Sequence, residues 1–489
     1  MARITAVIDI GSNSARMVVF ERTSRFGFHL LKEIKSKVRI SEGAYENGGA
    51  LQQEAMDRAV NAMEGFLSIA NGYSARKILC VATSAVRDAP NKTEFLARVK
   101  KQTGISIKVI DGPKEAHFGA VAALNMLKIE DAITVDIGGG STEMALIKNG
   151  KIEDLISLNL GTVRLKELVF DKNLPLDEAI KFVGAELDRV PNHFKSQTVI
   201  GIGGTNRALS NAIMSISDYP VDTLHGFEFS LDEYSGFIDS LISSKVGKLK
   251  NFGIKPERYD VIREGALIIK SVIEKVGASK MIASGVGVRE GVFLSDLLRN
   301  QNDKFPKNFS PSLRSLLDRF GSNEYATKQI TQAAKMLFEA LKDVHKLDDK
   351  ELQYLSHAAK LLNIGIYLNF YSHRYHSHYM VLNNLDYGFT HIDKLIIASI
   401  VKYHGKKFSG LDTDCFYNML KPHEDRIKWL SIVLSIAEAL TVDKSGAKLQ
   451  ISYEKECIQI KSDKKMYLAG EKLKLLLKGS GLNFHIETV

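Results

Sequence analysis

Two short stretches of this chain combine an aspartate with a turn of glycine and small polar residues. Asp9 precedes Gly11-Ser12-Asn13-Ser14, and Asp136 precedes Gly138-Gly139-Gly140-Ser141-Thr142. Turns of this composition hold successive backbone N–H groups in a concave nest, which binds an anion without a cationic side chain. An aspartate beside such a nest suits Mg²⁺, held directly or through water. The two stretches therefore indicate sites for phosphate groups and a divalent cation.

The two stretches are related copies. Each turn follows an apolar, β-branched run that predicts a buried strand, Val7–Ile10 in one copy and Thr134–Ile137 in the other. A second predicted strand follows each turn. One Asp-Ile-Gly sequence alone would be an ordinary hairpin turn, because so short a motif is common. Two copies in matching contexts favour a duplicated phosphate-binding fold.

The predicted elements after each copy also correspond. After the first turn we expect strands over 16–21 and 28–34, a helix over 52–70, a strand over 77–83, a helix over 92–102, a strand over 105–110 and a helix over 114–127. After the second we expect strands over 144–148 and 152–158, helices from 162 to 190, a strand over 198–202, a helix over 205–214, a strand over 280–283 and a helix over 288–298. Both halves give the order βββαβαβα. Such an α/β order predicts mixed sheets covered by helices, with ligands bound at loop ends between the two domains.

The composition is that of a multidomain enzyme. The chain has 489 residues and 45% hydrophobic content, which is enough for several cores. No apolar run approaches about 18 residues, and no signal-peptide pattern precedes the first predicted strand, so we expect no membrane association and a cytoplasmic location. The three cysteines, Cys80, Cys415 and Cys457, are far apart and are expected to be free thiols.

The formal net charge of +9 is concentrated in the C-terminal part of the chain. The lysines there include Lys402, Lys406, Lys407, Lys464, Lys465, Lys472, Lys474 and Lys478. They form either a solvated surface or a track for a polyanion. Aromatic residues that would stack on bases are sparse among them. This pattern favours phosphate chains over sequence-specific nucleic acid.

Several further motifs join the two turns in a specific order. They are Thr83-Ser84-Ala85-Val86-Arg87, Asp111-Gly112-Pro113-Lys114-Glu115-Ala116, Gly201-Ile202-Gly203-Gly204-Thr205 and Ser284-Gly285-Val286-Gly287-Val288-Arg289-Glu290-Gly291. With the turns, they make residues 1–300 resemble the exopolyphosphatase / guanosine pentaphosphate phosphohydrolase (Ppx/GppA) family, which belongs to the superfamily of sugar kinases, Hsp70 and actin. The rest of the chain resembles the long, four-domain members.

The resemblance implies an architecture. We expect two tandem ribonuclease-H-like domains over 1–125 and 126–301, an all-α, degenerate HD-like domain over 302–445 and a small α+β domain over 446–489. It also implies the partners: inorganic polyphosphate and guanosine pentaphosphate or tetraphosphate as ligands, and a second copy of the chain in a homodimer.

The resemblance also implies a chemical role for Glu115. By itself, a glutamate in the first turn of a helix is common, and the helix N-terminus is expected to keep it ionised near neutral pH. In the family this position is the general base that acts on the attacking water. Asp136 and Glu143 resemble the family's metal-associated acids, which would hold Mg²⁺. Asp9 would do similar or purely structural work.

The remaining candidate residues are expected to bind phosphate. They are Gly11, Ser12, Asn13, Ser14, Arg16, Arg87, Gly138, Gly139, Gly140, Ser141, Thr142, Gly203, Gly204 and Arg289. Arginine suits bidentate contact with phosphate. For Arg16, Arg87 and Arg289, a salt bridge with a nearby acid is the alternative role.

The HD-like resemblance rests on His357, on His376 and His378, and on Tyr403-His404. Metal-binding HD domains carry a His-Asp pair where this chain has Leu362-Asn363, and Ala437-Glu438 stands where Ala-Asp is usual. Leucine cannot ligate a metal and asparagine is a poor ligand. We therefore expect a non-catalytic scaffold whose histidines are surface or structural groups.

Two other functions fit parts of the pattern. An acetate-kinase-like or sugar-kinase-like phosphotransferase would also have two phosphate loops, and it would need an adenosine site and an acceptor. A non-catalytic regulator that binds guanosine polyphosphate would need no base at Glu115. The sequence favours polyphosphate as main substrate, with guanosine pentaphosphate as a second one.

Overall fold

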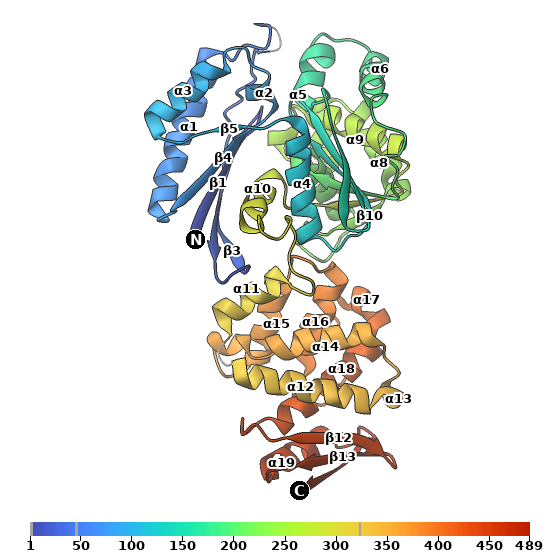
Figure 1. Ribbon diagram of the computed structural model, residues 1–489. Helices are drawn as coiled ribbons and strands as arrows, with labels where there is room; N and C mark the ends of the chain where they lie inside the picture. Colours follow the sequence, from blue (N-terminus) through green and yellow to red (C-terminus); the bar gives the residue numbers. More distant parts are fainter. Residues whose placement is uncertain (1–2, 45–46, 322–323) are drawn as a thin grey trace. The chain divides into compact units, whose positions relative to one another are not determined.

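The chain divides into two compact units. The computed structural model describes residues 3–44, 47–321 and 324–489. The units comprise Met1–Phe309 and Ser310–Val489, and each is described by itself. Figure 1 shows the two open sheets and their helices in the first unit, and a mostly helical second unit.

The first sheet has five strands in the order β3-β2-β1-β4-β5. Its strands are β1 (Ile4–Ile10), β2 (Ala15–Arg22), β3 (Phe28–Ser36), β4 (Lys77–Ala82) and β5 (Lys108–Val109). The helices of this region are α1 (Gln53–Gly72), α2 (Ser84–Arg87) and α3 (Lys92–Thr103). Apolar side chains of α1 and α3, such as Met63 and Phe95, pack on the apolar strands β1 and β4 and form one core. The predicted strand over 105–110 is limited to the two residues of β5.

The second sheet repeats this plan. Its six strands have the order β10-β11-β9-β6-β7-β8. They are β6 (Ala132–Ile137), β7 (Thr142–Lys148), β8 (Lys151–Leu158), β9 (Thr198–Ile202), β10 (Glu228–Ser230) and β11 (Lys280–Ala283). The hairpin β6-β7-β8 and the parallel strands β9 and β11 correspond to β1-β2-β3, β4 and β5. The addition is β10, an antiparallel edge strand that the sequence pattern did not predict.

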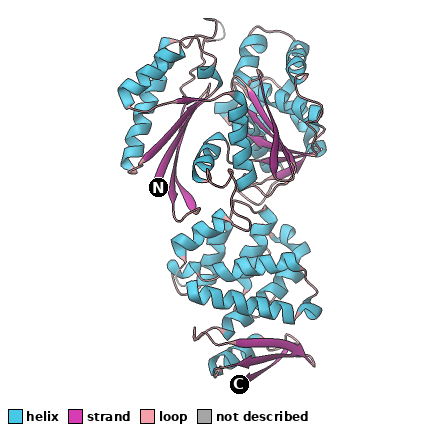
Figure 2. Cartoon of the chain, in the orientation of Figure 1, coloured by secondary structure: helices cyan, strands magenta, loops and turns pink. Residues whose placement is uncertain are grey.

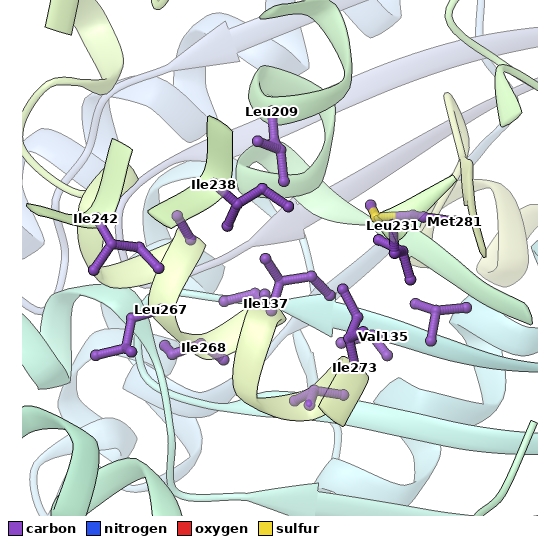
Figure 3. Close-up of a cluster of buried hydrophobic side chains, with 14 of the residues drawn as sticks. Val135, Ile137, Leu209, Leu231, Ile238, Ile242, Leu267, Ile268, Ile273 and Met281 are labelled. Atoms are coloured by element: carbon purple, nitrogen blue, oxygen red, sulfur yellow. The ribbon is translucent and has the colours of Figure 1, made fainter. Parts of the chain in front are cut away.

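The helices around the second sheet bury a second core. They are α5 (Thr162–Leu165), the π-helix η2 (Lys166–Phe170), α6 (Leu176–Leu187), α7 (Gly203–Ile216), α8 (Leu231–Ser243), the 3₁₀ segments η3 (Val246–Phe252) and η4 (Pro256–Arg258), and α9 (Ile262–Val276). Figure 3 shows Leu209, Ile238 and Ile268 from three of these helices among strand residues such as Val135 and Ile137. Each fully buried side chain of this size contributes roughly 1.5–3 kcal/mol through the water it sheds.

Two helices connect the sheets. Helix α4 (Gly112–Met126) follows the first sheet in the chain, yet it packs on β7 and β8 of the second sheet. Helix α10 (Val288–Leu297) follows the second sheet and packs on β1 and on α4. The two helices lie between the sheets (Figure 1). Ala120 contacts Ala145 and Ile147, which fixes α4 to the second sheet.

The second unit combines helices with a three-stranded sheet (Figure 2). Its helices are α11 (Pro311–Phe320), α12 (Glu324–Ala340), α13 (Lys342–His345), α14 (Asp349–Leu361), η5 (Ile364–Tyr367), α15 (His373–Asn384), α16 (His391–Tyr403), α17 (Tyr417–Leu420), η6 (Lys421–His423), α18 (Glu424–Leu440) and α19 (Tyr467–Leu476). The sheet has the order β12 (Leu449–Glu454), β13 (Cys457–Ser462), β14 (Asn483–Thr488). Strand β14 was not predicted; it pairs parallel to β13 after the α19 crossover.

Two simpler predictions concern cysteines and membrane helices. Cys80, Cys415 and Cys457 are free thiols, as predicted. Within the described residues, no helix has both the length and the apolar character needed to cross a membrane.

Candidate active site

The two glycine-containing turns close equivalent hairpins. In the first, Asp9 pairs with Arg16 across β1 and β2. In the second, Asp136 pairs with Glu143 across β6 and β7. Directly opposed residues of an antiparallel pair point to the same face, so the two acids of the second hairpin share a face. Each turn is closed by the same backbone bond, from Gly11 N–H to Ser14 O at 3.2 Å and from Gly138 N–H to Ser141 O at 2.9 Å.

The two turns face each other closely. A Cβ on Gly139 would lie 2.9 Å from Cβ of Ser12, so only glycine permits this approach. In the described chain, the backbone N–H groups of Ser12, Asn13, Gly139 and Gly140 donate to no protein acceptor. Unpaired N–H groups in consecutive turn positions form an anion nest. The turns thus present two such nests toward one another.

A solvent-open cleft of about 920 Å³ lies where the turns meet. Fourteen predicted site residues line it: Asp9, Gly11, Ser12, Asn13, Ser14, Arg16, Glu115, Asp136, Gly138, Gly139, Ser141, Gly203, Gly204 and Arg289. The other four predicted residues, Arg87, Gly140, Thr142 and Glu143, are not part of this lining. Each of the four bonds to protein groups, as described next.

The four residues outside the lining form hydrogen bonds with other protein groups. Arg87 donates from Nη1 to Oε2 of Glu115 at 3.3 Å. Glu143 is buried and accepts a 2.9 Å bond from the Ser157 hydroxyl. The carbonyl of Gly140 accepts from Arg164 Nε at 2.9 Å. Thr142 is fully buried, and its hydroxyl donates to Leu160 O at 2.5 Å.

Glu115 lies in the first turn of α4. This helix starts where it does because the Asp111 side chain accepts from Lys114 N–H at 2.8 Å and Pro113 occupies an early helical position. Glu115 is 8% exposed. Its pKa is well above the ordinary value, because burial and the charges of Glu143, Asp9 and Asp136 outweigh the opposing charge of Arg87. The helix N-terminus therefore acts on Glu115 against burial and three neighbouring carboxylates, which the sequence-based expectation did not include.

The pKa values of the other carboxylates in and next to the cleft are also raised. Burial raises the pKa of Asp9 to about 6 and that of Glu143 to about 7. Burial raises the pKa of Asp136 too, although the charges of Arg207, Arg16 and Arg289 oppose this. Oδ1 of Asp9 is buried and has no hydrogen-bond partner among the residues that the structure describes. A bound cation would satisfy this oxygen and offset the repulsion.

The cleft also carries a group of cations: Arg16, Lys35, Arg207, Arg258 and Arg289. Burial and neighbouring positive charges, that of Arg258 first, lower the pKa of Lys35 to about 8. Burial and the charges of Arg207 and Arg289 lower the pKa of Arg16 to about 10. Arg289 is anchored by a 2.7 Å bond from Nη1 to Oε1 of Glu33. Like charges held together in this way favour a multiply charged anion between them.

Lys35, Arg207 and Arg258 were missed from the sequence. Arg207 lies one turn after the start of α7, where Nε donates to Gly203 O at 3.0 Å and Nη1 to Gly285 O at 3.1 Å. Its position just after Gly203-Gly204 is the one local signal that could have found it. Lys35 near the end of β3 and Arg258 in η4 carry no motif, because tertiary folding alone brings them to the cleft.

Gly203 joins β9 to α7 under a strict steric condition. Its φ is +86°, and a Cβ there would lie 2.4 Å from Oδ1 of Asp136. Glycine is therefore required both for the backbone conformation and for the space. The helix that follows has 14 residues, and its N-terminal residues line the cleft, where a helix N-terminus attracts an anion.

Sequence comparisons agree with this geometry. A model described as the Ppx/GppA phosphatase family matches residues 18–300, and one described as Ppx/GppA phosphatase, domain III, matches residues 310–477. The chain is 30% identical over 299 residues to a bifunctional 3-dehydroquinate synthase/phosphatase of Fusobacterium nucleatum, covering 58% of this chain and only 45% of that protein. It is 26% identical over 414 residues to a guanosine-5'-triphosphate,3'-diphosphate pyrophosphatase of Pseudoalteromonas translucida, covering 82% and 80%.

Solved structures give the same result. A Ppx/GppA family member of Aquifex aeolicus superposes with a TM-score of 0.54 at 27% identity, over 62% of this chain and 99% of that one. An exopolyphosphatase from Cytophaga hutchinsonii gives 0.55 at 25% identity, over 62% and 100%. The predicted architecture, two actin-like α/β domains, a helical domain and a small sheet domain, is confirmed. Because the family model covers more than half of its residues, including the second turn and Glu115, this chain belongs to the Ppx/GppA phosphatase family.

Proposed function

We propose that this protein releases orthophosphate from the end of inorganic polyphosphate, and that it also hydrolyses guanosine pentaphosphate to guanosine tetraphosphate. One observation carries the proposal: the two equivalent hairpin turns meet at a single cleft, and the carboxylate of Glu115 lines the same cleft. A terminal phosphoanhydride needs this combination of anion sites and a water-activating group. Family membership supports the hydrolase class.

The residues present fit Mg²⁺. Asp136 and Asp9 would hold it, with Glu143 behind them, and the unpartnered Oδ1 of Asp9 is a ligand atom without another role. In the described residues these carboxylates do not form a group of three with ligand atoms within 4.8 Å. Mg²⁺ fits such a site because it usually takes one or two carboxylates and keeps waters and substrate phosphates as its other ligands. When bound, it would neutralise charge on the phosphoryl group.

The chain's own residues supply the remaining steps. The two nests hold the terminal phosphate through backbone N–H groups, and Arg16, Arg207 and Arg289 hold the anion that extends from it. Glu115 takes a proton from water, and the water oxygen bonds to the terminal phosphorus while the bridging P–O bond breaks. The electron pair of that bond leaves with the shortened chain. Orthophosphate is the other product.

Arg87 positions the base in this scheme. Its 3.3 Å bond reaches Oε2 of Glu115 from outside the cleft lining. Its positive charge lowers the pKa of Glu115 against the four effects that raise it. A base whose pKa lies near the working pH accepts a proton most effectively.

The decisive experiment follows phosphate release in the absence of any acceptor. We expect the purified protein with Mg²⁺ to release orthophosphate from long-chain polyphosphate. Initial rates on polyphosphate and guanosine pentaphosphate, measured on one sample, rank the two substrates. Phosphate transfer that requires an acceptor would support a kinase instead, and tight binding of guanosine polyphosphate without cleavage would support a regulator. A homodimer and a cytoplasmic location stay predictions. Light scattering of the purified chain tests the homodimer.

A further inference from the structure

A second group of ligand atoms lies in the helical unit, independent of the cleft. One ligand atom each from His373, His404 and Glu438 lies within 4.8 Å of the other two. Among the residues the structure describes, this is the one group of three or more histidine, cysteine, aspartate or glutamate residues that meets this condition. The residues come from three helical segments, the start of α15, the residue after α16, and α18.

Hydrogen bonds prepare both histidines for metal binding. His373 Nδ1 lies 3.0 Å from the carbonyl of Phe370, and His404 Nδ1 lies 2.5 Å from the carbonyl of Val401. A carbonyl only accepts, so each Nδ1 carries the proton and each Nε2 keeps its lone pair. A backbone carbonyl bonded to the other ring nitrogen is the usual partner of a metal-binding histidine, because it fixes the tautomer and the ring orientation.

Within the described residues, no protein donor reaches Nε2 of His373. Nε2 of His373 is buried without a hydrogen-bond partner, an arrangement that costs free energy unless a ligand fills it. His404 is only 2% exposed. In the described part of the chain no salt bridge joins Glu438 to either imidazole, so the three groups lie close together without satisfying one another.

The backbone next to His404 fits this arrangement. Gly405 has a φ of +74°, and its N–H donates to the Ser435 hydroxyl at 2.8 Å. A Cβ on this glycine would lie 3.7 Å from Oε2 of Glu438. The turn therefore brings the end of α16 against the face of α18 that carries the carboxylate.

We propose that His373, His404 and Glu438 bind one divalent transition-metal ion, which joins α15, α16 and α18. Two imidazoles and one carboxylate suit Zn²⁺, Mn²⁺ or Fe²⁺ and disfavour Mg²⁺, which takes oxygen ligands. Leu362 and Asn363, which replace the usual His-Asp pair, are not ligands in this proposal. The expectation that these histidines are only surface or structural groups rested on that pair and on Glu438 in place of the usual aspartate, and it did not consider His373.

The test uses the full-length chain without a histidine tag, stripped with EDTA and reloaded with Zn²⁺. After desalting, the wild type is expected to retain one zinc per chain by elemental analysis. H373Q and E438Q are expected to retain none. Co²⁺ in place of Zn²⁺ should give visible absorption bands of a four- or five-coordinate ion in the wild type and not in either variant.

Two controls make the result specific. H376Q alters a histidine of the same helix outside the group, and E143Q alters a buried carboxylate next to the cleft lining; both should retain one zinc. In EDTA the H373Q chain should melt at the wild-type temperature, and Zn²⁺ should raise the melting temperature of the wild type alone. A wild type that retains no zinc, or an H373Q chain that retains as much as the wild type, overturns the proposal.

Discussion

Nη1 of Arg87 and Oε2 of Glu115 are 3.3 Å apart, and they belong to different parts of the first unit. Arg87 ends α2 beside the first sheet, whereas Glu115 belongs to a helix packed on the second sheet. Side chains of this pair are 19% and 10% exposed, so solvent screens their attraction less than at the surface. The contact therefore links the two α/β domains directly at the candidate base.

Arg87→Gln tests this link. Loss of the guanidinium removes the charge that lowers the pKa of Glu115, so a higher pH is needed to ionise the base. The acid side of the pH–rate profile should shift to higher pH, with a smaller effect on KM than on kcat. Arg87→Lys should partly restore the profile. A uniform loss of activity at every pH would indicate a structural role only.

Glu115→Gln should remove the proton acceptor while keeping the shape of the side chain. Loss of a general base lowers kcat by roughly 10²–10⁴-fold, whereas binding of polyphosphate should be retained, since the nests and arginines are unchanged. Steady-state kinetics and a binding measurement on the same sample separate the two. Glu94→Gln is the matched control, because Glu94 is an exposed glutamate in the first turn of α3. Activity of the Glu115 variant near that of this control would refute the assignment.

Gly203→Ala should damage the site more than the fold. The added Cβ would lie 2.4 Å from Oδ1 of Asp136 at a φ of +86°, so the carboxylate must move and the turn is strained by about 1–2 kcal/mol. We expect phosphate release to fall at least tenfold and the melting temperature to drop by a few degrees. Gly184→Ala in α6 meets no atom within 4 Å, and it should keep activity and gain about 0.5–1 kcal/mol of stability. Equal activity of the two variants would contradict the close approach.

Arg207→Gln should weaken substrate binding. Two of its nitrogens donate to carbonyl groups of the cleft wall, and its charge would attract the phosphate anion proposed to bind between the two turns. Loss of a charged hydrogen bond costs roughly 1.5–3 kcal/mol, which corresponds to about a 10- to 150-fold rise in KM. Arg189→Gln, at a side chain that is 50% exposed and pairs with Glu186, is the control. The KM effect should shrink at high salt, and an unchanged KM would remove Arg207 from the site.

Glu264, which lies outside the cleft lining, is expected to make the free energy of unfolding depend on pH. Burial raises its pKa from 4.5 to about 7, and Oε2 has no hydrogen-bond partner. Between these values the folded state keeps a proton that the unfolded state releases, so this group's stabilising contribution falls as pH rises from 4.5 to 7. The loss amounts to roughly 3 kcal/mol. Urea unfolding at several pH values should show a smaller slope in Glu264→Gln than in the wild type, with the remaining slope due to Asp9 and Glu143, whose pKa values are raised in the same range.

The control for that series is Glu274→Gln. Glu274 lies on the same helix, and its side chain is 64% exposed. Its replacement should leave the pH dependence of the free energy of unfolding as it is in the wild type. A Glu264→Gln chain with the wild-type slope would show that other groups cause the dependence.

The sequence predicted those parts of the site that a local motif specifies. The turns after Asp9 and Asp136 need glycine and small polar residues wherever the strands lie, so their composition was readable. Arg258 and Lys35 could not be found in this way, because their roles depend on which distant segments fold against the cleft. The causes that raise the pKa of Glu115 were missed for the same reason: the helix terminus is local, whereas the neighbouring carboxylates are not.

The same distinction, between features set by a local motif and features set by tertiary packing, applies to the fold. The duplicated order of strands was predicted because apolar runs and turns repeat along the chain. Strand β10 has three residues and β5 has two, too few for a periodic pattern, and they form because a neighbouring strand offers free backbone groups. The packing of α4 on the second sheet could not be inferred from its place in the chain, since only the contacts of Ala120 and its neighbours determine it.

Because α4 packs on the second sheet while Arg87 lies beside the first, the spacing of Arg87 and Glu115 depends on how the two sheets are held together. Helix α10 packs on both α4 and β1 and therefore holds this spacing. A substitution that loosens the contact of α10 with α4 should thus alter the candidate base from outside the cleft lining.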